Sequence, residues 1–456
     1  MLKVFLRLAG GLLGLVILAV VALFAVNATD VPLSEEAQAL LRQSAPPLPS
    51  ERNGFIDFLA LGAPAEAPTF ATGVAQLAVL NKQADGQLLD VAIDPRARQC
   101  RYNEILSCIS RDPLLKQVVA SHAVLLARYR AMREKPEFVD LQVRTSPEEP
   151  LLAYLPLTSG NRLLLTQAAL EFHAGRRARA LDELEAEFRF HRTMAAGSRS
   201  LIAKMIAFAM LGGDALFAAD LARNMPARDR AQWARLQALL HAPTKAELDL
   251  SDVLKQENAQ IAEWMSTRKY VRMSDAVYES IKSFNPEFKR PWWDPLAPWL
   301  YRPHYSVNRY VAQSNLMLAV AERPASQFLA AQKEQQARVQ ELDQPVWKPL
   351  VLSPAGTFSW VFSEGYSDYI GRAHAVAAMF ELTALQVDLR AAGITRPADV
   401  TRAVAGPRGR AHLNPFTDQP MEFDAEKMTL GFACTLKLLP GTLRLIAADG
   451  RVALPL

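Results

Sequence analysis

Two carboxylates and an imidazole recur at a helical spacing in the middle of the chain. Glu183, Glu187 and His191 follow one another at intervals of four residues, so that on a helix they would share one face. Carboxylate and imidazole groups ligate divalent metals when another helix supplies further ligands. Arg189 and Arg192 lie among them, however, and ion pairs on a helix surface explain the same pattern. We therefore predict a solvated helix face here, with no metal site and no cofactor.

A serine and a lysine are the second set with catalytic spacing. Ser266-Thr-Arg-Lys269 has the SxxK form, which in penicillin-binding enzymes places a lysine one helical turn from the serine nucleophile. Ser306-Val-Asn308 follows in the SxN form, but the third element, Lys-Thr/Ser-Gly on a strand, is missing downstream. No GxSxG, HExxH or CxxCH motif occurs in the sequence. We predict no catalytic activity, and Ser266 and Lys269 are the pair that an enzyme would use.

Aromatic and basic residues are concentrated between residues 288 and 305, among several prolines. Tryptophan and tyrosine favour membrane interfaces, and with arginine they dominate binding hot spots, so this loop could lie on a membrane, stack on a sugar or hold a partner. A proline-stiffened loop that packs across the helical body is the simpler interpretation, and we favour it. If the loop binds, the contact residues would be Trp292, Trp293, Trp299, Tyr301 and Arg302.

The N-terminus carries the strongest pattern in the sequence. Lys3 and Arg7 precede an uninterrupted apolar run over residues 8–26, which at about 1.5 Å per helical residue suffices to cross a bilayer core of roughly 30 Å. Val26-Asn27-Ala28 also resembles a cleavage site, but a retained anchor is the interpretation that we favour. Because the basic residues precede the span, we predict a single-pass protein of the bacterial inner membrane with a cytoplasmic N-terminus and a periplasmic body.

The cysteines support export. Cys100 and Cys108 would lie in an oxidising compartment, where a disulfide between them is plausible. On one straight helix they would be about 12 Å apart, too far to bridge, so the disulfide requires a turn between them. Cys434 lies in an apolar run and is expected to be buried.

The bulk composition indicates a globular protein. Half of the 456 residues are apolar and 21% are charged, which argues against disorder. The formal net charge is only +4, and basic residues are scattered among acidic ones, so we predict no nucleic-acid partner.

The patterning predicts a mainly α fold: a transmembrane helix, a body of paired helices in an irregular array, and a small C-terminal cap with a β-hairpin. We assign residues 1–28 to the anchor or uncleaved signal, 29–98 to a linker and N-terminal arm, 99–397 to the helical body, and 398–456 to the cap. Within the body and cap, helices are expected at 201–211, 214–223, 228–240, 245–273, 274–283, 307–321, 325–342 and 367–392, and strands within 421–432 and 443–454, the last with a turn at Asp449-Gly450.

Residues 161–194 form the clearest pair of helices. Ala168, Gly175, Ala180 and Leu184 occupy positions where a tetratricopeptide unit has small or apolar residues, and the segment resembles such a helical hairpin. The resemblance implies a concave surface that binds another protein. In general appearance the chain is similar to proteobacterial envelope proteins.

Three functions remain open at this stage. The first is a membrane-anchored periplasmic scaffold without catalytic activity, which binds an envelope protein as its partner. The second is an envelope hydrolase or transferase that acts on peptidoglycan or on a lipid-linked glycan. The third is a carrier of a lipid or another amphiphile, which predicts a large apolar pocket between helices.

Overall fold

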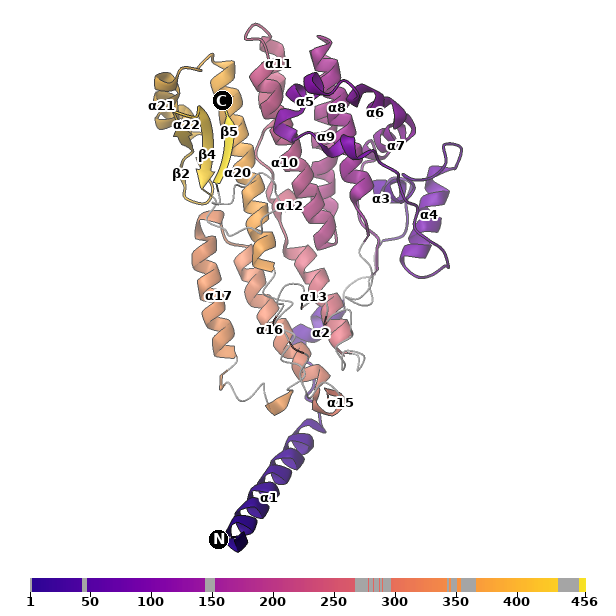
Figure 1. Ribbon diagram of the computed structural model, residues 1–456, viewed down its shortest axis with the longest axis vertical. Coiled ribbons are helices and arrows are strands. Elements are labelled where there is room, and N and C mark those ends of the chain that lie inside the picture. The colour runs from indigo at the N-terminus through magenta and orange to yellow at the C-terminus, as the bar shows by residue number, and fades with distance from the viewer. Residues whose placement is uncertain are drawn as a thin grey trace.

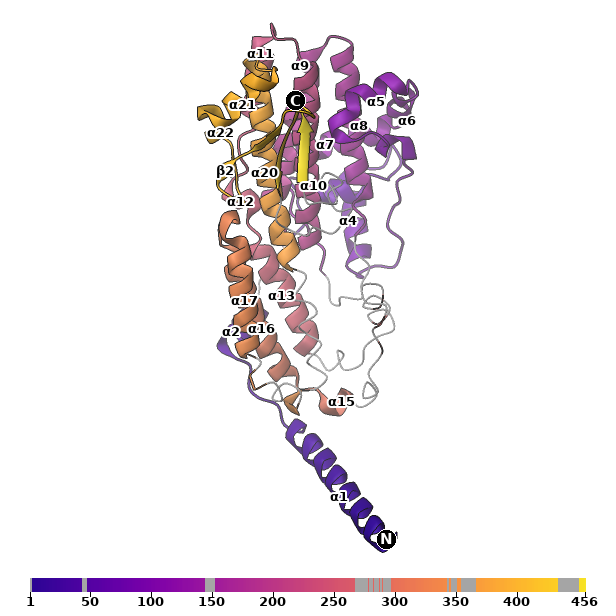
Figure 2. The ribbon, with the colours of Figure 1, turned by 60° about the vertical axis from the view of Figure 1, so that its left-hand side comes forward.

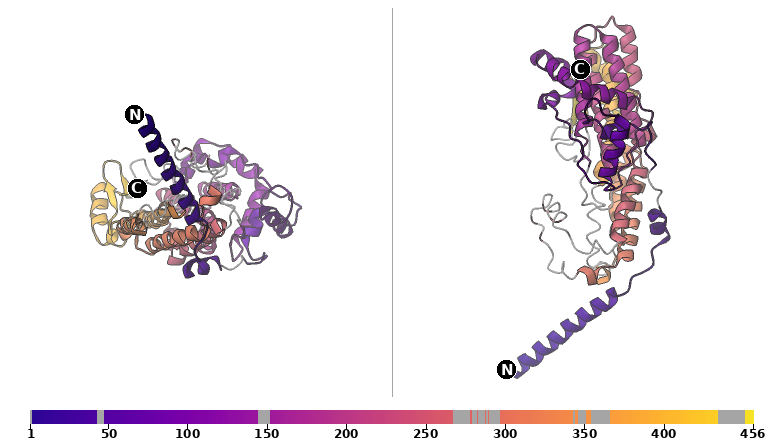
Figure 3. Two further views of the ribbon diagram at one scale, coloured as in Figure 1. Left: turned by 90° about the horizontal axis from the view of Figure 1, so that it is seen from below. Right: turned by 90° about the vertical axis from the view of Figure 1, so that its right-hand side faces the viewer.

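A long apolar helix projects from one end of an elongated helical body (Figures 1 and 3). This helix, α1 (Leu2–Asn27), exposes its apolar side chains from Leu12 to Val21. It is long and apolar enough to cross a membrane, and so is α10 (Leu201–Asn224), but α10 is mostly buried within the body. The computed structural model describes residues 2–42, 47–143, 152–266, 278, 282, 287, 289, 297–342, 344–345, 351–353, 366–433 and 451–456.

The segment after α1 is fixed to the body by hydrogen bonds. The buried Asn27 amide donates to the carbonyl oxygen of Val351 at 2.7 Å. The Asp30 carboxylate accepts the backbone N–H groups of His304 and Tyr305 at 2.7 and 3.1 Å, at the start of α16 (Pro303–Ala321). A carboxylate at a helix N-terminus is favourable because the N–H groups there have no partner within the helix. The first turn of α16 therefore holds the base of α1 in place.

The centre of the body is the predicted helical hairpin, which the structure confirms as α8 (Leu155–His173) and α9 (Arg177–Gly197). Gly175 joins them with φ +81°, a left-handed conformation that favours glycine after a helix end. Short elements of the arm and of the first part of the body surround this hairpin. Those that contact α8 are η1 (Pro95–Arg98), α5 (Ile105–Arg111), α6 (Leu115–Ser121) and α7 (Ala123–Arg133). The helix α3 (Gly54–Leu59) packs on α4 (Thr69–Leu80) and on α7, and η2 (Tyr102–Glu104) packs on α10.

The prediction of two helices at 201–211 and 214–223 is wrong. One continuous helix, α10, spans both, and its Gly212-Gly213 pair does not end it. The helix is buried on nearly all sides, and a Cβ at Gly213 would lie 2.7 Å from the ring of Tyr102. Because Gly213 has no side chain, the Tyr102 ring packs against the backbone of α10. This tertiary packing overrides the weak helix propensity of Gly212 and Gly213.

The disulfide prediction is confirmed. Cys100 and Cys108 are bonded, with their Cα atoms 5.8 Å apart. The chain turns through η2 between them, so that only Cys108 lies within α5. The bond joins the middle of α5 to the segment before the helix, as the spacing required.

A second layer of helices lies between the centre and α1 (Figures 1 and 2). A small apolar core joins α2 (Glu35–Leu41), α13 (Ser251–Ser266) and α16, and contains the buried side chains of Ala37, Met265 and Tyr310. The helix expected over 245–273 is divided into α12 (Lys245–Leu248), which packs on α9, and α13, and residues 267–273 lie outside the described part. The remaining elements of this layer are α15 (Ala297–Leu300), η5 (Ala325–Gln327) and α17 (Phe328–Leu342).

The helix α20 (Tyr366–Ala391) packs along α10 and carries the C-terminal cap (Figure 1). The cap begins with two helices that the sequence did not predict, and continues as two small antiparallel sheets. Strand β4 pairs with β3 and with β5, and Leu430 lies opposite Leu454. The expected Asp449-Gly450 turn and Cys434 lie outside the described residues. The cap elements are α21 (Pro397–Ala405), α22 (Pro407–Arg410), β1 (Leu413–Asn414), β2 (Gln419–Pro420), β3 (Glu422–Asp424), β4 (Thr429–Ala433) and β5 (Arg451–Pro455).

The remaining helix of the body is α11 (Arg230–Leu239), which confirms the helix predicted over 228–240 and packs on α9 and α20.

Candidate functional sites

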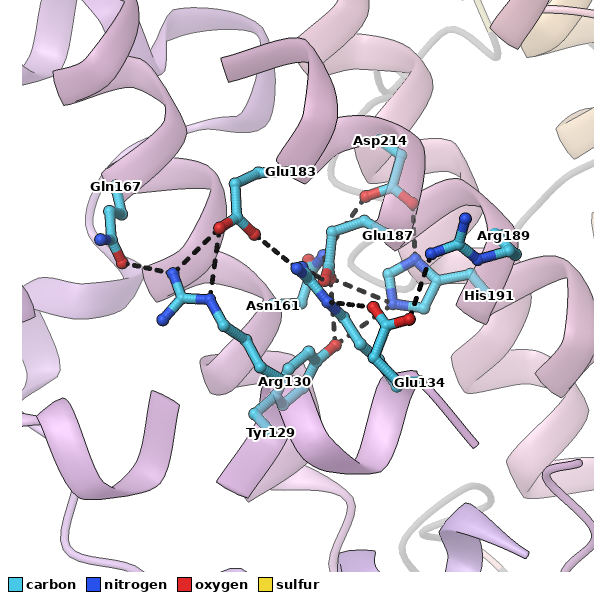
Figure 4. Close-up of polar contacts among 11 residues, drawn as sticks. Tyr129, Arg130, Glu134, Asn161, Gln167, Glu183, Glu187, Arg189, His191 and Asp214 are labelled. Atoms are coloured by element: carbon cyan, nitrogen blue, oxygen red, sulfur yellow. Dashed lines mark hydrogen bonds and ion pairs between the residues drawn. The ribbon is translucent and has the colours of Figure 1, made fainter. Parts of the chain in front are cut away.

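A buried polar network lies where four helices meet (Figure 4). Tyr129 comes from α7, Asn161 from α8, Glu187 and His191 from α9, and Asp214 from α10. All five side chains are fully buried. Ionisable groups are rarely buried unless they are paired, so the contacts of each must be accounted for.

His191 faces an acceptor at each ring nitrogen. Its Nδ1 lies 2.5 Å from Asp214 Oδ2, and its Nε2 lies 3.3 Å from the Tyr129 hydroxyl and 3.6 Å from Glu187 Oε2. The Tyr129 hydroxyl donates to Glu187 Oε2 at 3.1 Å. The Tyr129 hydroxyl can therefore accept a hydrogen bond from the imidazole N–H while it donates one to the carboxylate. The geometry suits an imidazolium, in which both nitrogens are donors.

Glu187 receives donors at both of its oxygens. Arg133 Nη1 donates to Oε1 at 2.9 Å, and Asn161 Nδ2 donates to Oε2 at 2.7 Å. Asn161 also lies 3.2 Å from Asp214 Oδ1, so it joins the two carboxylates. The positive charges of Arg133 and the imidazolium balance the negative charges of Glu187 and Asp214. This pairing lowers the free-energy cost of burying the four groups.

Burial and the neighbouring charges shift the pKa values of three groups in the network. Burial lowers the pKa of His191, but the adjacent Asp214 more than offsets this, and the pKa lies above its ordinary value. Burial raises the pKa of Asp214 to about 6 despite its hydrogen bond with His191. Burial and the Glu187 charge raise the pKa of the Tyr129 hydroxyl well above its usual range. The network therefore holds protons more firmly than the same groups in water.

Glu187, His191 and Asp214 offer three groups that metals accept, with ligand atoms within 4.8 Å of one another. Their arrangement does not fit one ion. The two carboxylates face different nitrogens of the same imidazole, whereas a single ion would be ligated by only one of those nitrogens. Three protein donors already satisfy the Glu187 oxygens. The group is better described as an internal ion-pair network.

The prediction of a solvated face at Glu183, Glu187 and His191 is wrong for the last two residues. The spacing correctly places them on one face of a helix, but α7, α8 and α10 cover that face. Glu183 remains nearer the surface, where it pairs with Arg130 at 3.1 Å and Arg133 at 2.7 Å. No local pattern indicates the covering residues, which are tens of positions away in the chain.

A cavity of about 390 Å³ lies between α10, α13 and α20. This volume is within the range of small-molecule sites, roughly 300–1,000 Å³. Its walls are mainly apolar, with a polar part in which Arg372 and Glu257 are the charged residues. The apolar lining comprises Leu201, Ile202, Met205, Ile206, Phe208, Ala209 and Val376, and the polar lining Gln142, Ser200, Gln256, Glu257, Gln260, Tyr369 and Arg372.

The two charged residues of the cavity differ in their contacts. Glu257 Oε1 accepts the N–H of Leu201 at 2.9 Å, at the N-terminus of α10. The Arg372 guanidinium lies over the ring of Tyr369, 4.8 Å from its centroid. Among the residues that the structure describes, no carboxylate lies within 4.0 Å of Arg372, and its buried Nε has no hydrogen-bond acceptor. The cavity thus contains a cation without a counter-ion from the described chain.

The residues predicted for nucleophilic catalysis do not line this cavity. Ser266 is the last residue of α13, and its hydroxyl donates to the Glu263 carbonyl at 2.7 Å. Lys269 lies outside the described residues. Asn308 of the SxN sequence binds the segment after α1, since it accepts the N–H of Ser34 at 2.8 Å and donates to Pro32 O at 2.9 Å. Ser306 is buried against Ser353.

The aromatic loop is described only from residue 297, so Trp292 and Trp293 lie outside the described part. Tyr301 and Arg302 are buried, with 6% and 7% of their surface exposed, and Tyr301 donates to the Met265 carbonyl at 2.6 Å. These two residues attach the described end of the loop to the body. Trp299 differs, because 59% of it is exposed, and it lies in α15 next to α1.

Comparison of the chain with models of protein families, with curated proteins and with solved structures gives no match.

Proposed function

We propose that this protein is a single-pass, membrane-anchored binding protein whose periplasmic body takes a single-chain amphiphile into the cavity between α10, α13 and α20. The observation that carries the proposal is the cavity itself, with an apolar wall on α10 and a guanidinium from α20 that has no counter-ion among the described residues. An apolar pocket with few polar groups is the usual form of a small-molecule site.

Three observations support the membrane anchor. The helix α1 is exposed along its apolar length, which is unfavourable in water and favourable in lipid. Arg7 precedes the most apolar part, which favours a cytoplasmic N-terminus. The Cys100–Cys108 disulfide is typical of an oxidising compartment such as the periplasm.

The junction supports retention of the anchor rather than its removal. Asn27, in the last turn of α1, is buried and bonded to Val351, and Asp30 caps α16. Cleavage after residue 28 would remove Asn27 and, with it, the hydrogen bond that joins the end of α1 to Val351 of the body. The exposed Trp299 beside α1 is placed where a membrane-interface residue would be.

The amphiphile carrier was one of three functions that the sequence left open, and the cavity is the specific observation that favours it. The helical hairpin behind the scaffold hypothesis packs on other elements at both helices, with α5, α6 and α7 on α8 and with α10 and α11 on α9. For the hydrolase hypothesis, no pair among the described lining residues resembles a nucleophile and its base.

Native mass spectrometry of the full-length protein, purified from membranes in amphipol, tests the binding. We expect a bound single-chain amphiphile on the wild type and its loss in Ala209→Phe, which places a phenyl ring in the cavity. Ala330→Phe is the matched control, because Ala330 is exposed on α17. An adduct of equal abundance on all three proteins, or on none, would contradict the cavity as a binding site.

Membrane insertion needs its own test. After alkaline carbonate extraction of cells, we expect the full-length protein in the membrane pellet, with the body digested by protease only once the outer membrane is opened. Release into the supernatant would contradict the anchor, and protection of the body in spheroplasts would contradict its periplasmic location.

A further inference from the structure

We infer that the cavity selects a long-chain carboxylate, with the anionic head group bound by Arg372 and the hydrocarbon chain against the apolar face of α10. The inference rests on the proposed function and specifies its ligand class. It follows from the charge of the lining, the contacts of its ionisable groups and the shape of the guanidinium.

Among the described lining residues, Arg372 is the only one with a permanent positive charge. Among the described residues its guanidinium has no hydrogen-bond acceptor and no counter-ion, which is unfavourable beside a largely apolar wall. The Tyr369 ring holds the guanidinium from one face, which fixes its plane and leaves the donor edge for an acceptor. A ligand that supplies this acceptor recovers the lost hydrogen bond and the missing counter-charge.

Glu257 does not form an ion pair with Arg372. Its Oε1 is engaged at the first N–H of α10, where the positive end of the helix dipole offsets a carboxylate. The amide residues nearby are neutral, and Gln256 accepts a hydrogen bond from Arg199 Nε at 3.1 Å. The charges of the described lining residues therefore favour the binding of an anion near Arg372.

A carboxylate suits this demand well. The two Nη groups of a guanidinium form a planar pair of donors that a carboxylate accepts in a bidentate manner. The apolar wall then receives the hydrocarbon chain, whose removal from water is favourable. Leu201, Met205 and Phe208 lie along α10 at intervals of three and four residues, so they form one continuous apolar stripe for an extended chain.

The test compares two ligands with the same chain and different head groups. Binding of radiolabelled oleate and oleyl alcohol is measured on the full-length protein in nanodiscs at about pH 8.5, where the carboxyl is ionised. The Ala209→Phe variant gives the background of ligand in the lipid. We expect the wild type to bind oleate about tenfold more tightly than the alcohol.

Variants of Arg372 separate charge from shape. Arg372→Gln should weaken oleate binding about tenfold and leave oleyl alcohol unchanged, while Arg372→Lys should retain part of the preference. Arg338→Gln is the control, since Arg338 is exposed on α17.

If the wild type binds both ligands equally, or if Arg372→Gln keeps the preference, the inference is wrong and the cavity still binds amphiphiles. If lysophosphatidylglycerol displaces oleate but binds far more tightly, the carboxylate assignment is overturned. If neither oleate nor alcohol binds above background, the proposed function fails with it.

Discussion

The Nδ1 atom of His191 lies 2.5 Å from Oδ2 of Asp214, and neither side chain is exposed to solvent. The pair joins α9 to the middle of α10, the helix that also forms the apolar wall of the cavity. The stability of the network and the shape of the cavity wall therefore depend on the same helix.

Asp214→Asn tests how much the network contributes. It removes the charge that faces the imidazole, and breaking a buried ion pair from one side costs about 3–5 kcal/mol. We expect a marked fall in the urea midpoint of the full-length protein. Asp182→Asn is the control, because Asp182 pairs with Arg235 at the surface with 62% of its side chain exposed, and such pairs contribute about 1 kcal/mol or less. Equal losses of stability in the two variants would show that burial does not strengthen the contact of Asp214 with His191.

The two adjacent glycines of α10 should respond in opposite directions to the same substitution. A Cβ at Gly213 would meet the Tyr102 ring at 2.7 Å, so Gly213→Ala is expected to destabilise by about 1–3 kcal/mol. A Cβ at Gly212 would meet nothing within 4 Å, so Gly212→Ala should stabilise the helix by about 0.5–1 kcal/mol. Thermal unfolding of the two variants beside the wild type checks the order, and a stabilising Gly213→Ala would refute the packing argument.

His412 should make the cap sensitive to alkaline pH. It lies between Glu381 and Asp388 of α20, at 3.0 and 3.1 Å, and hydrogen bonds to Asp388 and Glu381 raise its pKa to about 9. Since the folded pKa exceeds the ordinary value of about 6.5, the stabilisation is complete below about pH 6.5 and disappears as the pH rises through about 9.

The experiment for His412 is urea denaturation of the wild type and His412→Gln at several pH values. After allowance for solvent screening, we expect the variant to be about 1–2 kcal/mol less stable near pH 6 and indistinguishable above about pH 10. A difference that does not change with pH would show that His412 acts by packing alone.

Reduction of the Cys100–Cys108 bond should loosen the segment that precedes α5. A disulfide that closes a loop of this size contributes about 2–3 kcal/mol, mainly by restricting the unfolded chain. The double variant Cys100→Ser/Cys108→Ser should show a lower unfolding midpoint, and faster amide exchange at residues 95–111 than elsewhere in the body. Unchanged exchange there would argue that the α5–α8 packing suffices.

Local features of the sequence predicted much of the architecture. The apolar run of α1, the hairpin closed by Gly175 and the turn required between Cys100 and Cys108 each depend on residues close together in the chain, and each is present. The continuous α10 was missed because Gly212-Gly213 is a local break signal, whereas its cause is the distant ring of Tyr102.

The sites were not predictable to the same extent. The spacing of Glu187 and His191 shows that they share a helix face, but not that Tyr129, Asn161 and Asp214 cover it. The cavity is built from residues between Gln142 and Val376, which no local pattern connects. Burial by distant elements is a tertiary property. The spacing of residues along one helix does not indicate which other element packs against that helix.

The most direct measurement is to map where an amphiphile contacts the protein. Full-length protein in membranes is incubated with a fatty acid that carries a photoreactive diazirine on its chain, irradiated, and digested for mass spectrometry. We expect adducts on the cavity wall of α10 and α20, at residues such as Met205, Ile206 and Val376, and their loss in Ala209→Phe. Adducts confined to α1, with none on the cavity wall, would contradict this expectation.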